Sequence, residues 1–74
     1  MEQRFIELFK EAIERESTVS LNDNFRNYPE WDSLAYLSII SVIDEEYDVI
    51  IEGNEFKELN TIEDIISEIK KKKS

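Results

Sequence analysis

The chain has 74 residues, which suits a single domain, here taken as residues 1–74. It has no cysteine and no histidine, so disulfides, thiolate chemistry and catalysis built on Ser/His or Cys/His pairs are excluded. Its net charge of −9 disfavours nucleic acid and anionic lipid as partners, and we expect a non-enzyme without a metal site.

Residues 2–16 are predicted to form the first helix. Apolar side chains recur there at helical spacing, with charged residues between them; they are Phe5, Ile6, Phe9, Ala12 and Ile13.

Residues 17–32 are predicted to form a long structured loop. Asn22, Asp23, Asn24, Asn27 and Pro29 favour turns. The loop is also too apolar for a disordered linker, because it contains Val19, Leu21, Phe25, Tyr28 and Trp31. We expect it to lie over the core, and a long loop in a small domain suggests a function.

Residues 33–47 are predicted to form the second helix, with Asp32 as its N-cap. One apolar arc would anchor it, formed by Tyr36, Ile39, Ile40, Ile43 and Tyr47. Leu34, Leu37 and Val42 are apolar but fall outside this arc. Two interpretations are open: these side chains dock a partner, or the long loop covers them through Trp31 or Phe25.

The remaining residues are predicted to form a link, a turn and two helices. Val49 to Ile51 suits an extended link, and Gly53-Asn54 a turn. A short helix over 55–59 and a last helix over 62–71 follow, the latter capped by Thr61 with a buried stripe of isoleucines. The stripe consists of Ile62, Ile65, Ile66 and Ile69. The fold class is all-α: three main helices and one short one, with a long first loop.

The charge is unevenly distributed along the chain. Residues 1–69 contain all 18 acidic residues but only five of the nine basic ones, a net charge of −13, and Lys70–Lys73 supply the other four. Such a surface favours basic partners, or serves solubility alone. We expect the lysines to favour the negative end of the last helix and then to fray.

No membrane or export signal is evident. No apolar stretch is long enough to span a bilayer, and the N-terminus lacks the basic start and apolar core of a signal peptide. A cytoplasmic protein is expected.

Ser33 stands at a helix start, where free N–H groups and the helix dipole stabilise an attached phosphate. Asp32 has two possible roles: it caps the helix, and it helps a modifying enzyme hold a metal ion beside the serine.

The segment from Trp31 to Tyr47 reads WDSLAYLSIISVIDEEY. It resembles the second helix of the acyl/peptidyl carrier protein family, whose hallmark is Asp-Ser-Leu at the helix start and an acidic stretch before an aromatic residue at its end. The segment from Glu55 to Ile66 resembles the short third helix and the start of the fourth. The likeness extends from about Phe25 to Ile69.

The resemblance implies a four-helix carrier fold and a covalent 4′-phosphopantetheine on Ser33, flanked by Asp32 and Leu34. A phosphopantetheinyl transferase would install the group from coenzyme A. Acyl or aminoacyl ligases, synthases or transferases would then use the carrier, which is expected to be a monomer. The predicted docking residues are Leu34, Leu37, Ile40, Ser41, Asp44 and Glu45.

One departure concerns the pathway. Carriers of primary fatty-acid synthesis usually have acidic residues soon after the Ser-Leu, where this chain has Ala35, Tyr36 and Ser38. Together with Trp31, this favours specialised biosynthesis over general fatty-acid or lipid biosynthesis.

The sequence leaves three other functions to consider. A small acidic adaptor or inhibitor that binds a basic surface without cofactor is compatible with the composition. A calcium loop starting at Asp44 and ending at Glu55 has acidic residues at most ligand positions, but Val49 replaces the glycine of its turn. A carboxylate-based enzyme has no feature that singles out a pair of acids.

Overall fold

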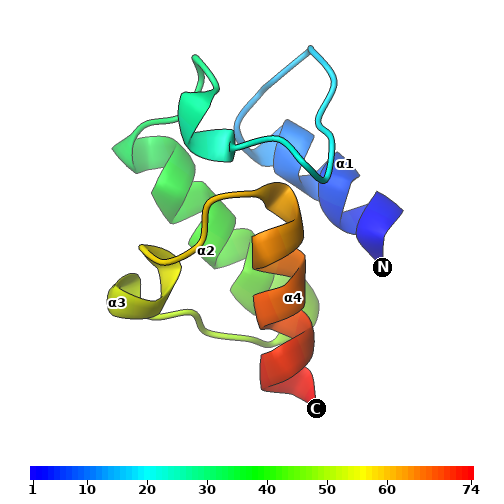
Figure 1. Cartoon of the computed structure of the whole chain (residues 1–74), viewed down its shortest axis with the longest axis vertical. Coiled ribbons are helices and arrows are strands. Elements are labelled where there is room, and N and C mark those ends of the chain that lie inside the picture. Colours follow the sequence, from blue (N-terminus) through cyan, green and yellow to red (C-terminus); the bar gives the residue numbers. More distant parts are fainter.

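The computed structural model describes all residues 1–74 and is a helical bundle (Figure 1). Its elements are α1 (Glu2–Ala12), the 3-10 turn η1 (Phe25–Asn27), α2 (Ser33–Tyr47), α3 (Gly53–Phe56) and α4 (Ile62–Lys73). Helix α1 packs against both α2 and α4. The long connection between α1 and α2, cyan in Figure 1, crosses one end of the bundle. The all-α prediction, with three main helices and a short one, is confirmed.

The core is formed entirely by apolar side chains. Helix α2 contributes Ala35, Ile39 and Ile43, and α4 contributes the four isoleucines of the predicted stripe. Tyr36, Ile40 and Tyr47 of the predicted arc are only partly buried at its border. The buried face of α2 is therefore centred on Ile39. None of the helices is long and apolar enough to cross a membrane.

Helix α1 ends at Ala12, so the prediction of a helix to residue 16 was wrong. The chain reverses in a Schellman motif: the Glu14 N–H donates to Glu11 O, and the Arg15 N–H to Lys10 O. Glu14 lies in the left-handed region with φ 56°, a conformation that glycine usually supplies.

The two C-terminal helices also differ from their predicted bounds. Gly53 and Asn54 do not form a turn; they begin α3, which spans 53–56 rather than 55–59, because Glu52 and Glu55 form a capping box. Helix α4 continues to Lys73 rather than 71. Its last turn does not fray, since Lys72 pairs with Glu55 at 2.7 Å and Lys73 Nζ donates to Tyr47 O at 2.8 Å.

The long connection is fixed by side chains from both of its ends. Arg15 pairs with Glu30 at 2.9 Å, donates to Thr18 O, and lies 3.9 Å from the centre of the Tyr28 ring. The Tyr28 hydroxyl donates to Asp23 at 2.7 Å. This bond lowers the pKa of Asp23, and burial raises the pKa of Tyr28. The connection is thus an ordered part of the bundle, as its apolar content predicted.

Candidate cofactor-attachment site

Ser33 is the first residue of α2 and is exposed. The Asp32 carboxylate accepts the N–H of Ala35 at 2.8 Å, which confirms Asp32 as the N-cap. The N–H groups of Ser33 and Leu34 donate to no backbone or side-chain acceptor. A phosphate on the Ser33 oxygen would lie at the positive end of α2, next to these free donors.

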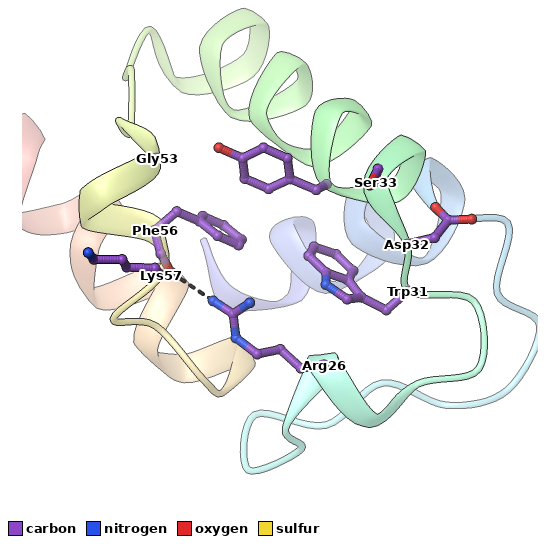
Figure 2. Close-up of a pocket in the computed structure, with 8 residues that line it drawn as sticks. Arg26, Trp31, Asp32, Ser33, Gly53, Phe56 and Lys57 are labelled. Carbon is purple, nitrogen blue, oxygen red and sulfur yellow. Dashed lines mark hydrogen bonds between the residues drawn. The ribbon is translucent and has the colours of Figure 1, made fainter.

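A pocket of about 440 Å³ opens beside Ser33, between α2 and α3 (Figure 2). We call it the aromatic pocket. It is lined by Arg26, Trp31, Asp32, Ser33, Tyr36, Gly53, Phe56 and Lys57. In Figure 2, Ser33 lies at its rim, Trp31 and Phe56 line its inner side, and the Asp32 and Lys57 side chains point outward.

Three aromatic rings give this pocket its shape. The Trp31 ring lies nearly parallel to Phe56, at an interplanar angle of 10° and with centroids 6.1 Å apart. The Tyr36 ring meets Phe56 edge-on at 5.1 Å. Behind them, Trp31 also contacts Phe9 and Phe25. The pocket wall is thus continuous with the hydrophobic core, which makes it a pre-formed surface.

Arg26 joins η1 to the α3 side of the pocket. Its guanidinium donates to Phe56 O at 2.9 Å and to Leu59 O at 2.8 and 3.0 Å. Phe56 is the last residue of α3, and Leu59 follows three residues later. It also lies against the Phe25 and Phe56 rings. One side chain of η1 therefore holds the end of α3 against η1.

Leu34 and Leu37 form an exposed apolar ridge on α2, on the side of the helix that faces the end of α1. The two residues are 74% and 57% exposed. The alternative that the long loop covers them is wrong, because Phe25 is fully buried and Trp31 packs on Phe9, Phe25 and Phe56 instead.

The other predicted docking residues lie on or near the same ridge. Ser41, Asp44 and Glu45 are exposed, whereas Ile40 is half-buried and packs against the core. Val42 is half-buried on the side that faces α1.

On that second side, α2 borders a shallow groove of about 620 Å³, which we call the α1–α2 groove. It is lined by Ala12, Glu14, Leu34, Leu37, Ser38, Ser41 and Val42. A smaller hollow of about 210 Å³ shares four of these residues and also reaches Glu30 and Asp32. Asp32 therefore borders both the aromatic pocket and this hollow.

The calcium-loop alternative does not fit the fold. Asp44 and Glu46 belong to α2, which continues to Tyr47, so the twelve-residue loop does not exist as one segment. No three acidic side chains of the structure are grouped so that they could hold a metal ion.

Two features of the site were not predicted from the sequence. Arg26 carried no local signal, because its acceptors lie some 30 residues away along the chain. The meeting of Tyr36 with Phe56 depends on the position of α3, which the sequence placed two residues too late.

A small four-helix bundle with an exposed serine at an acid-capped helix start is the geometry of a carrier domain. The family model for the phosphopantetheine attachment site matches residues 3–69 of the 74. No curated protein and no solved structure matches significantly. The chain belongs to the phosphopantetheine-binding family, whose members carry a covalently attached 4′-phosphopantetheine.

The residues around α2 fit this group. A phosphodiester needs an accessible hydroxyl and hydrogen-bond donors, which Ser33 and the free N–H groups of the first turn supply. The rest of the group is a flexible amide chain, and the aromatic pocket beside Ser33 presents an apolar wall along which it can lie.

Proposed function

We propose that 4′-phosphopantetheine is attached to Ser33 and that the chain carries acyl or aminoacyl groups to partner enzymes. The observation behind this proposal is the position of Ser33: exposed, first in α2, after the Asp32 cap and before an exposed leucine. Ser33 is also the serine of the Asp-Ser-Leu motif within the family match.

In this proposal the protein positions the cofactor and presents its cargo to partner enzymes, and it catalyses no reaction itself. When bound, the cofactor supplies the thiol on which cargo is held as a thioester. Asp32 orders the first turn of α2, and the flexible arm gives the cargo a high effective concentration at a docked enzyme.

Partner enzymes would dock on the exposed side of α2. Its apolar centre is Leu34 and Leu37, and the acidic Asp44 and Glu45 lie toward its far end, with Ser41 between them. Ile40 is half-buried, so only the exposed part of its side chain would contribute to this docking surface. Carboxylates around an apolar centre suit enzymes with basic docking surfaces.

The transferase, ligase and synthase partners, the monomeric state and the cytoplasmic location expected from the sequence all belong to this proposal. So does service in a specialised pathway, which is supported by Ala35, Tyr36 and Ser38, the residues at positions where primary carriers are acidic.

The test is the intact mass of the protein before and after incubation with coenzyme A, Mg²⁺ and a broad-specificity phosphopantetheinyl transferase. We expect a gain of one phosphopantetheinyl group, mapped to Ser33 by peptide analysis. Ser33→Ala should remain unmodified, whereas Ser67→Ala, at an exposed serine of α4, should be modified like the native chain.

A folded protein that gains no mass, beside a control carrier that does, would contradict the proposal. The small acidic adaptor without cofactor would then be tested by binding to a basic protein, which Ser33→Ala should leave intact.

A further inference from the structure

Glu14 has an unusual backbone for a glutamate. It follows the end of α1 with φ 56°, where glycine would avoid the steric cost of the side chain. Its side chain is exposed and makes no hydrogen bond or ion pair within the chain. Nothing inside the fold therefore accounts for a glutamate at this position.

Glu14 also lies near the chain neighbours of Ser33. It borders both the α1–α2 groove and the smaller hollow, and that hollow reaches Asp32 and Leu34, the chain neighbours of Ser33. Ser33 itself lines the aromatic pocket, so an enzyme that covers the start of α2 on both sides of Ser33 would also meet this hollow.

The charge around the groove has one sign. No lysine or arginine lines either hollow. The nearest cation in sequence, Arg15, is turned into the long connection, where it pairs with Glu30 and lies on Tyr28. The Glu30 carboxylate is thereby taken, and Glu14 is left as a free negative charge beside the apolar side chains of Ala12, Leu37 and Val42.

We propose that the α1–α2 groove is a docking site for the phosphopantetheinyl transferase and that Glu14 receives a lysine or arginine of that enzyme. The occupant is a segment with one apolar side chain, which rests between Ala12 and Val42, and one basic residue beside it. The negative charge of Glu14 and the position of the hollow next to Asp32 and Leu34, on either side of Ser33 in the chain, both favour the transferase as that occupant. This inference rests on the proposed function, and it extends the docking surface from α2 onto the end of α1.

The experiment compares Glu14→Gly with Asp48→Gly. Asp48 is exposed, has the same φ of 56°, and ends α2 about 20 Å from Ser33 along the helix. Both variants lose one negative charge, and both place glycine at a position with a left-handed backbone, which removes the steric cost of the side chain. Only Glu14→Gly changes the groove. Glu14→Lys serves as the charge reversal, and kcat and KM for modification are measured with the unmodified protein as the varied substrate.

For Glu14→Gly we expect KM to rise about threefold to tenfold with kcat unchanged, while Tm rises by about 3–6 °C. Asp48→Gly should raise Tm and leave KM as it is. Glu14→Lys should raise KM further, by about tenfold or more, and the increase should shrink in high salt. A more stable protein that is a poorer substrate would separate a docking role from a structural one.

A second variant tests the groove itself. Ser38 borders both hollows and is half-buried, so Ser38→Phe should fill the groove and raise KM about tenfold while circular dichroism shows an unchanged helix content.

Equal KM values for Glu14→Gly, Asp48→Gly and the native chain would overturn the inference. Ser33 would still be modified in that case, and the proposed function would stand. Failure of modification in the native chain would instead contradict the proposed function.

Discussion

The two sides of α2 differ in how they are built. The aromatic pocket on the α3 side is formed by η1, α2 and α3, and its rings continue into the hydrophobic core. The α1–α2 groove on the other side is formed only by the end of α1 and the outer face of α2. It presents aliphatic and acidic side chains, whereas the pocket presents aromatic rings and two cations.

Under the proposed function, the two sides of α2 would have different tasks around Ser33. A pocket continuous with the core keeps one shape whichever enzyme is bound, which suits a cofactor that is always the same. A shallow groove with exposed side chains can be altered at little cost to folding, which suits a contact surface for the proposed transferase. Substitutions on the pocket side should therefore change stability much more than those on the groove side.

The largest expected effect is at Phe56, which is 2% exposed and contacts Phe25, Trp31 and Tyr36. Phe56→Ala should lower the free energy of unfolding by about 3 kcal/mol, because it leaves a cavity under the pocket. Leu34→Ala, at a leucine that is 74% exposed, should change it by less than about 0.5 kcal/mol. Urea unfolding measures both, and equal effects would contradict the proposed difference between the two sides.

Arg26→Ala comes next. It removes three hydrogen bonds to the carbonyls of Phe56 and Leu59, and should cost about 1–2 kcal/mol. Arg26→Lys should not restore the loss, since a single ammonium cannot reproduce the planar fork. Arg4→Ala is the control, at an arginine that is 62% exposed in a surface ion pair, and should cost less than about 0.5 kcal/mol. Full rescue by lysine would show that only the charge of Arg26 matters.

Asp32 borders both sides, and two substitutions separate its two roles. Asp32→Ala should lower stability by about 1 kcal/mol through loss of the cap on α2, whereas Asp32→Asn should keep the cap. If the carboxylate also helps the transferase hold its metal ion, Asp32→Asn will lower kcat for modification of Ser33 without a change in Tm. An unchanged kcat would leave capping as its one role.

A small gain in stability is expected at Gly53, the first residue of α3. Its φ is not in the left-handed region, and an added Cβ would meet the Tyr36 hydroxyl at an ordinary 3.6 Å. Gly53→Ala should therefore raise the free energy of unfolding by about 0.5 kcal/mol, by reducing the freedom of the unfolded chain. A loss of stability would mean that α3 must shift to admit the methyl group.

Elements with strong local signals were predictable from the sequence. The bounds of α2 were predicted correctly, since Asp32 is a good cap and the apolar residues recur over the whole helix. The isoleucine stripe of α4 and the packing of the long connection on the core were also predicted correctly. The exposed leucines were identified, but the sequence left open whether the loop covers them.

The errors occurred where distant contacts decide the outcome. Residues 13–16 contain no helix breaker, and α1 ends there while Arg15 turns to Glu30 and Tyr28. Glycine and asparagine suggested a turn at 53–54, where a capping box starts α3. The last turn of α4 is held by Glu55 and Tyr47, which lie far from the lysines in sequence. A single sequence does not show which of its distant residues will contact one another.

The long connection between α1 and α2 has a consequence for amide hydrogen exchange. The N–H of Phe25 donates to Asn60 O, that of Ile62 to Asp23 O, and that of Glu63 to Leu21 O. None of these three bonds is made within a helix, yet they link the connection to the start of α4. Their amide protons should exchange only when the whole bundle opens, so the longest irregular segment of the chain belongs to its most cooperative unit.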